Sequence, residues 1–128
     1  MNEVEKKLVL STLGHTWIFD LDGTIVKHNG YKIDGEDTFL EGAEQFLKNI
    51  PKKDMIIFLT SRTEEYRVQT EKFLTEKNIR YDAIIFNAPL GERILLNDSK
   101  PKGLVTALAV PRHRDCWDKL LVTENENL

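Results

Sequence analysis

Residues 17–24 read Trp-Ile-Phe-Asp-Leu-Asp-Gly-Thr, and this stretch decides the fold. An apolar run ends here in two carboxylates, Asp20 and Asp22, and Gly23 then permits a tight turn with positive φ. Mg²⁺ prefers oxygen ligands and usually keeps a substrate phosphate in its coordination shell. The stretch therefore predicts a buried strand that ends in a site for a hard cation and a phosphate.

The composition is that of one small folded domain. The chain has 128 residues, of which 41% are hydrophobic, so residues 1–128 can bury a sheet and its covering helices. The net charge is -3 and the Lys and Arg residues form no stripe, so we expect no nucleic-acid partner. The single cysteine, Cys116, and the lack of a long apolar run predict a protein of the reducing cytoplasm with no membrane partner.

Apolar runs alternate with helical patterns along the chain. Continuous apolar runs predict strands that are covered on both faces, and they lie at 16–20, 55–60, 82–86, 93–97 and 104–110. Helical spacing between 39 and 50 predicts one helix, which Pro51 ends, and Thr63 caps a second helix that ends near Asn78. This order predicts an α/β fold, a single Rossmann-like domain with a mostly parallel sheet flanked by helices.

Three polar residues follow apolar runs and are expected to meet at one edge of that sheet. Asp20, Thr60 and Asp98 each stand at the end of a run, and ligands bind beyond the carboxyl ends of parallel strands. Residues 87–92 are too few for a parallel crossover, which needs about a dozen residues. Either these residues return in extended form or one of the two neighbouring runs is antiparallel. We favour an arrangement that keeps Asp98 at the site.

Three segments, in this order, resemble the motifs of the haloacid dehalogenase-like superfamily of phosphatases. They are Asp20–Thr24, Met55–Arg62 and Arg93–Asp98, and the resemblance covers roughly residues 14–110, the expected core. It implies a phosphatase without a cap domain, because residues 25–38 are long enough only for a flap. Residues 97–104, Asn-Asp-Ser-Lys-Pro-Lys-Gly-Leu, show a weaker likeness to a branch associated with bacterial surface-polysaccharide biosynthesis.

The resemblance implies two catalytic carboxylates and a metal site. Asp20 would attack phosphorus and form an aspartyl phosphate, and Asp22 would act as general acid and then as general base. The alternative for Asp22 is a purely structural role, as a turn residue before Gly23. The implied ligands of Mg²⁺ are Asp20, Asp22 and Asp98, with Asn97 standing where many relatives carry a second acid.

The remaining site residues would bind the phosphoryl group. Thr60 and Lys100 would complete the catalytic set, and Gly23, Thr24, Ser61 and Arg62 would contact the substrate. Lys100 is chosen because the shortened segment before Asp98 holds only Arg93, and a solvated loop lysine is an equally good interpretation. The alternative for Thr60 is a hydroxyl that caps the strand end or the following helix, and the alternative for Arg62 is a side chain exposed to solvent.

These roles predict a Mg²⁺-dependent phosphomonoesterase that acts on a small phosphorylated metabolite, a sugar phosphate or a nucleotide-linked precursor of polysaccharide biosynthesis. The alternative is a non-catalytic module of the same fold that binds a phosphorylated ligand. A phosphoryl site without a cap is open to water, so something must cover it. We expect a neighbouring copy of the chain to do so, which predicts a homo-oligomer.

Overall fold

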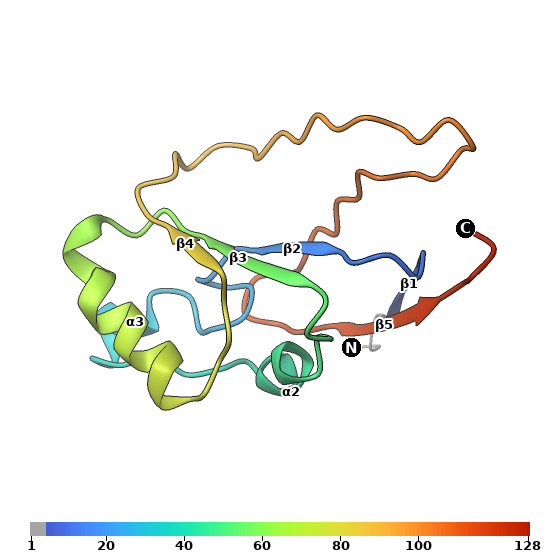
Figure 1. The fold of residues 1–128 in the computed structure, drawn as a ribbon. Coiled ribbons are helices and arrows are strands. Elements are labelled where there is room, and N and C mark those ends of the chain that lie inside the picture. The colour runs from blue at the N-terminus through green and yellow to red at the C-terminus, as the bar shows by residue number, and fades with distance from the viewer. Residues whose placement is uncertain (1–4) are drawn as a thin grey trace.

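The computed structural model describes residues 5–128, and its larger sheet is parallel and three-stranded. The strand order is β2 (Thr16–Phe19), β3 (Met55–Leu59) and β4 (Ala83–Ile85), as Figure 1 shows. Ile18 lies opposite Ile57, and Phe58 lies opposite Ile84. The strands predicted at 16–20, 55–60 and 82–86 are therefore confirmed, and so is an α/β class with parallel strands.

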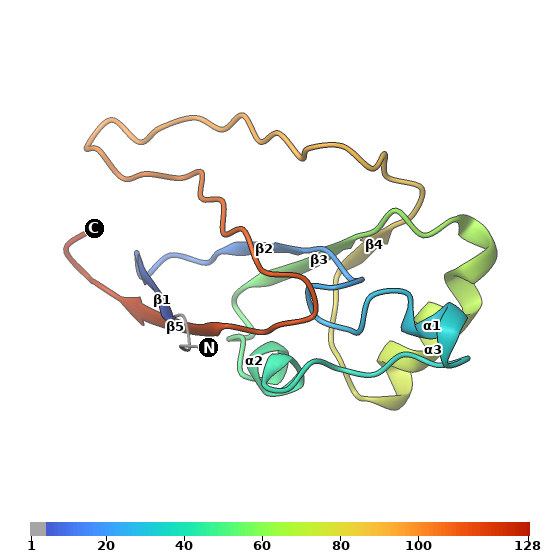
Figure 2. The same ribbon diagram turned by 180° about the vertical axis from the view of Figure 1, so that it is seen from behind.

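Short helices connect these strands. They are α1 (Gly30–Ile33), α2 (Ala43–Lys48), the 3₁₀ turn η1 (Glu64–Tyr66) and α3 (Arg67–Glu76). Figures 1 and 2 show α2 and α3 on the same side of the larger sheet. The helix predicted between 39 and 50 is shorter than expected, because Gly42 before it has a φ of 94° and lies outside the helical region. No helix within residues 5–128 combines the length and the apolarity that a membrane span requires.

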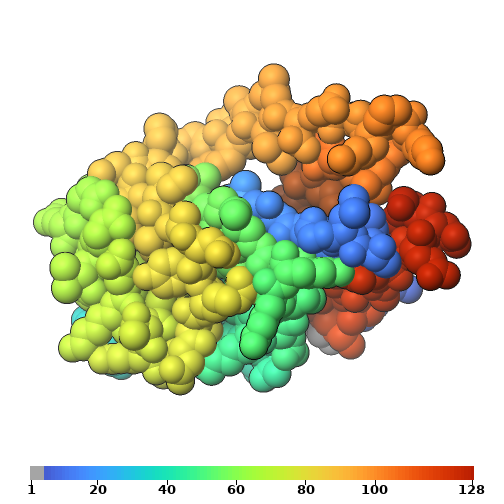
Figure 3. Space-filling model, viewed as in Figure 1, coloured from blue at the N-terminus to red at the C-terminus, as the bar shows by residue number. Residues whose placement is uncertain are grey.

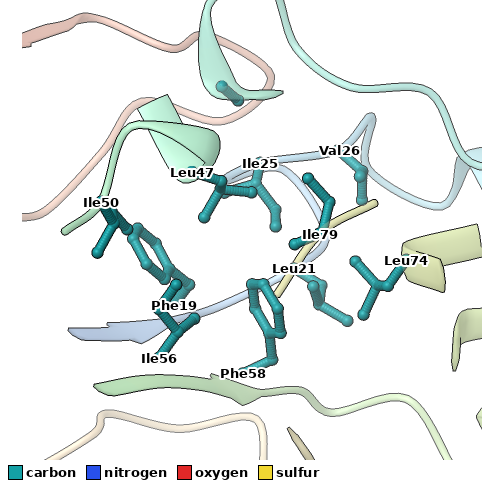
Figure 4. Packing of buried hydrophobic residues seen from close by; sticks show 11 residues of the cluster. Phe19, Leu21, Ile25, Val26, Leu47, Ile50, Ile56, Phe58, Leu74 and Ile79 are labelled. Atoms are coloured by element: carbon teal, nitrogen blue, oxygen red, sulfur yellow. The ribbon is translucent and has the colours of Figure 1, made fainter. Parts of the chain in front are cut away.

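The hydrophobic core lies between the larger sheet and the helices (Figure 4). Side chains alternate along the strands, so Phe19 and Phe58 are buried while Ile18 and Ile85 are 53% and 51% exposed. The apolar runs predicted a sheet covered on both faces, and the structure places helices on one face only. The buried cluster is Phe19, Leu21, Ile25, Val26, Ala43, Leu47, Ile50, Ile56, Phe58, Leu74 and Ile79.

A second parallel sheet joins the two ends of the described chain. β1 (Glu5–Leu10) pairs with β5 (Lys119–Glu124), a pairing that the sequence analysis did not predict. His15 links the end of β1 to the start of β3. Its Nε2 lies 2.9 Å from the carbonyl oxygen of Ser11, and its Nδ1 lies 3.1 Å from both carboxylate oxygens of the buried Asp54.

Residues 93–97 and 104–110 form no strand, and the prediction of strands there is wrong. Both runs belong to a long irregular segment that passes over the uncovered face of the larger sheet (Figures 1 and 2). Ile94 and Leu96 are 82% and 85% exposed. Only residues 86–92 separate β4 from the first run, too few for a parallel return to the sheet.

Candidate functional site

A tight turn after β2 shapes the carboxyl edge of the larger sheet. Asp20 follows the strand, and the carbonyl oxygen of Leu21 accepts a hydrogen bond from the amide of Ile25 at 3.1 Å. Gly23 has a φ of 80°, and a Cβ added there would lie 3.1 Å from Cγ of Arg114. The turn therefore requires glycine both for its backbone conformation and for the approach of Arg114.

Asp20 is the centre of an exposed polar group at this edge. Its carboxylate accepts a hydrogen bond from Oγ1 of Thr24 at 3.1 Å and lies 3.5 Å from Nη1 of Arg93. Nη2 of Arg93 donates to Oγ of Ser61 at 3.3 Å. The side chains of Asp20 and Arg93 are each 36% exposed. The structure thus brings together three of the predicted residues and adds Arg93, to which the sequence analysis gave no role.

Arg62 lies in the interior rather than in solvent. Its guanidinium donates two hydrogen bonds to the carboxylate of Asp22, both at 3.0 Å, and two to that of Asp37, at 2.9 and 2.6 Å. Nη1 also donates to Oγ1 of Thr70 at 2.9 Å, and the guanidinium carbon lies 3.9 Å from the centre of the Tyr31 ring. The side chain of Arg62 is 1% exposed, so it cannot meet a ligand from solvent in this arrangement.

The cluster around Arg62 holds charges that burial alone would disfavour. Burial acts to lower the pKa of Arg62, but the hydrogen bonds to Asp37 and Asp22 outweigh it and raise the pKa above its ordinary value. Burial also raises the pKa of the Tyr31 hydroxyl, and the charge of Asp22 adds to this effect. Arg62 therefore stays charged, and it engages both carboxylate oxygens of Asp22, the residue predicted to transfer protons.

Thr60 is held inside the end of the sheet. It is fully buried, and its Oγ1 accepts a hydrogen bond from the amide of Arg62 at 3.1 Å. Its own amide donates to the carbonyl oxygen of Ile85, and its carbonyl oxygen accepts from the amide of Ala88. These bonds extend the pairing of β3 and β4 past the strand ends. Contact between Thr60 and a phosphate stays a prediction.

Asp98 and Lys100 lie on the irregular segment, where both are exposed. The carbonyl oxygen of Asp98 accepts a hydrogen bond from the hydroxyl of Thr106, and no contact joins Asp98 to Asp20 within residues 5–128. In the same part of the chain, no three His, Cys, Asp or Glu side chains group closely enough to hold a metal ion. The three predicted Mg²⁺ ligands do not fit one ion in this arrangement, and the need for Mg²⁺ stays a prediction.

Two solved structures contain chains that are similar to this one. A chain of the Pnkp1/Rnl/Hen1 complex is 28% identical with a TM-score of 0.50, and the match covers 65% of this chain and 31% of that one. A chain of the Pnkp1/Rnl/Hen1 RNA repair complex is 28% identical with a TM-score of 0.51, covering 66% and 29%. The chain thus spans less than a third of these neighbours. No protein-family model and no curated protein matches it.

These likenesses correct the functional expectations drawn from the sequence. The neighbours are components of an RNA repair complex, so the identification as a haloacid dehalogenase-like phosphatase is wrong, and so is the predicted phosphomonoesterase activity on a small metabolite. The same likenesses contradict the predicted partners, which were a small phosphorylated substrate and a second copy of the chain. They also contradict the expectation that no nucleic acid binds. The comparisons contain nothing that favours the alternative module. Short motifs at the ends of strands indicate local chemistry only. Proteins of unrelated function carry similar motifs at the edges of their sheets, so the motifs did not determine the function.

Proposed function

We propose that the chain is an RNA-binding domain that holds a phosphate-bearing RNA end at the carboxyl edge of its larger sheet and acts within RNA repair. The observation that carries the proposal is the 28% identity to chains of the Pnkp1/Rnl/Hen1 complex, which is named an RNA repair complex. The proposal concerns the region of those neighbours that this chain matches. The cytoplasm stays the proposed location because the chain has a single cysteine.

Arg93 supports the proposal through its chemistry and its position. A guanidinium carries five N–H donors and binds phosphate through paired hydrogen bonds. The contacts of Arg93 with Asp20 and Ser61 orient its side chain, which remains 36% exposed. The hydroxyl of Thr24 lies beside Asp20 and can add a further contact. Asp20 has the same sign of charge as a phosphate, so we retain Mg²⁺ as the proposed cofactor that would screen the two.

We also propose that the sheet becomes Rossmann-like when RNA binds. β2 is an edge strand, and such strands offer unpaired N–H and C=O groups to a further strand. Residues 94–96 are apolar, exposed and outside any sheet. Residues 93–97 would add beside β2 as an antiparallel strand, because Arg93 already lies at the carboxyl edge, and this would cover the apolar surface.

The proposed RNA site is tested by fluorescence anisotropy with three internally labelled single-stranded RNAs, with and without Mg²⁺. One carries a 5′-phosphate, one carries a 3′-phosphate and one has hydroxyls at both ends. Charge-assisted hydrogen bonds contribute about 1.5–3 kcal/mol, so we expect one phosphorylated RNA to bind about 10- to 100-fold more tightly than the hydroxyl RNA.

A pair of arginine variants localises the effect. Arg93→Gln should remove the preference for phosphate. Arg80→Gln should keep it, because Arg80 is similarly exposed, at 39%, but lies at the opposite edge of the sheet, where it donates to the carbonyl oxygen of Asp54. Equal affinity of the parent protein for all three RNAs would contradict the proposal.

A further inference from the structure

Residues 99–114, which we name the basic strap, differ in charge from the rest of the chain. They include Lys100, Lys102, Arg112 and Arg114 and no Asp or Glu, although the net charge of the whole chain is -3. An apolar stretch separates the two pairs of cations, so the sequence shows no continuous basic run. This spacing explains why the sequence analysis excluded nucleic acid.

Three of these cations are available to a ligand. The side chains of Lys100, Lys102 and Arg114 are exposed, and within residues 5–128 no ion pair joins them to a carboxylate. Arg112 differs, because its guanidinium lies 4.6 Å from the ring centre of Trp117 and anchors the strap to the body of the protein.

Many cations elsewhere are already neutralised. Lys27 pairs with Asp34 at 2.9 Å, and Lys53 pairs with Glu124 at 2.7 Å. An exposed cation with a carboxylate partner contributes less to the attraction of a polyanion, because the two opposite charges partly cancel. The unpaired cations of the basic strap therefore attract a nucleic acid more strongly than the net charge of the chain suggests.

Both flanks of the basic strap are fixed at the candidate site. After it, the amide of Asp115 donates to the carbonyl oxygen of Gly23 at 2.9 Å, and Oδ1 of Asp115 accepts from the amide of His28 at 2.7 Å. Before it, Arg93 reaches Asp20. The segment between these anchors stands away from the sheet, and Figure 3 shows an opening between them. A strand that starts at the carboxyl edge and extends along the irregular segment would reach the strap.

We propose that the basic strap binds the backbone of single-stranded RNA whose phosphate end occupies the carboxyl edge. The inference rests on the proposed function, and it assigns the surface that receives the rest of the strand. Single-stranded RNA carries one negative charge per nucleotide, and proteins that bind single strands contact the backbone with exposed cations. An acidic peptide would meet the same cations, but the anchoring of the strap at a predicted phosphate site favours RNA.

The test compares two double variants that lose the same charge. Lys100→Ala with Lys102→Ala alters the basic strap. Lys52→Ala with Lys77→Ala is the control, because both lysines are exposed and lie before β3 and β4, at the opposite edge of the sheet. Affinity is measured by anisotropy for oligouridines of 4 and 16 nucleotides, each with a terminal phosphate or with hydroxyls only, over a range of salt concentrations.

The strap variant should bind the 16-mer at least fivefold more weakly than the parent protein and the 4-mer within twofold of it. Its salt dependence should be shallower by about 1.4 in the log–log slope, since each phosphate contact on a single strand contributes about 0.7. The control variant should match the parent protein on both RNAs. Equal losses in the two variants, or no loss in the strap variant, would overturn the assignment.

Failure of the end site has a separate signature. If phosphorylated and hydroxyl RNAs bind alike while the strap variant still weakens the 16-mer, the end site is wrong and the strap assignment stands. If the protein prefers phosphorylated RNA and the strap variant binds the 16-mer as the parent protein does, the strap assignment is wrong and the end site stands. Tighter binding of polyglutamate than of the 16-mer, at the same charge and salt concentration, would show that an acidic peptide is the partner and would refute the RNA assignment.

Discussion

Replacing Arg62 with methionine should destabilise the protein strongly, because it leaves two carboxylates without their cation. The side chain of Asp37 is 2% exposed and that of Asp22 is 16% exposed, and both accept paired hydrogen bonds from Arg62. Removal of one partner from a buried ion pair costs about 3–5 kcal/mol. For a domain of this size, that loss lowers the Tm by about 10–20 °C. Methionine keeps an unbranched apolar stem and removes the guanidinium together with its contact with the Tyr31 ring, so it tests the charged group.

The loss is measured by urea unfolding, followed through tryptophan fluorescence. Arg67→Met is the matched control, since Arg67 also contacts two carboxylates, Glu64 at 2.7 Å and Glu71 at 3.0 Å, but is 36% exposed. Solvent screens such pairs, so its loss should be far smaller. Adding Asp37→Asn to Arg62→Met should restore part of the stability because it removes an uncompensated charge. Equal losses for Arg62→Met and Arg67→Met would refute the buried network.

Three further predictions concern the turn, the β3 start and the irregular segment. Gly23→Ala should lower stability by about 1–2 kcal/mol in urea unfolding, since the φ of 80° disfavours a side chain and the new Cβ would press on Arg114; an unchanged midpoint would contradict the geometry. The pKa of Asp54 is lowered, because hydrogen bonds from Trp17 and His15 outweigh the opposing effect of burial. A lowered pKa stabilises the fold above the unfolded value of about 3.9 and loses this effect as pH falls through the folded value, so Asp54→Asn should flatten the stability profile below about pH 4. Amide hydrogen exchange of residues 94–96 should be fast in the free protein and at least about tenfold slower with phosphorylated RNA, and unchanged rates would exclude strand addition to β2.

Local patterns predicted the strands that form the larger sheet, because continuous apolarity is a property of the residues themselves. They failed where the outcome depends on a distant partner. Residues 93–97 have the same apolarity as a strand but no neighbour in the sheet. The pairing of β1 with β5 joins segments from the two ends of the chain, and neither segment indicates the other.

In the candidate site too, features set by adjacent residues were predicted, and features that depend on distant residues were missed. The turn chemistry of Asp20, Gly23 and Thr24 follows from adjacent residues and was predicted as a group. The burial of Arg62 was missed, because Asp37 lies in the segment expected to be a flap and nothing near Arg62 in the sequence points to it. Arg93 was noticed only as the cation before Asp98, and its contact with Asp20 depends on the course of the chain after β4.

The most direct test of the account is a comparison of amide NMR shifts in ¹⁵N-labelled protein with phosphorylated and with hydroxyl RNA of the same sequence. The difference between the two RNAs isolates the place of the terminal phosphate. The account predicts that this difference is concentrated on the amides of Asp20, Gly23, Thr24 and Ser61, at the carboxyl edge of the larger sheet. Identical shifts with both RNAs, or a difference centred at the opposite edge near Lys52, would contradict an RNA-end site at Asp20.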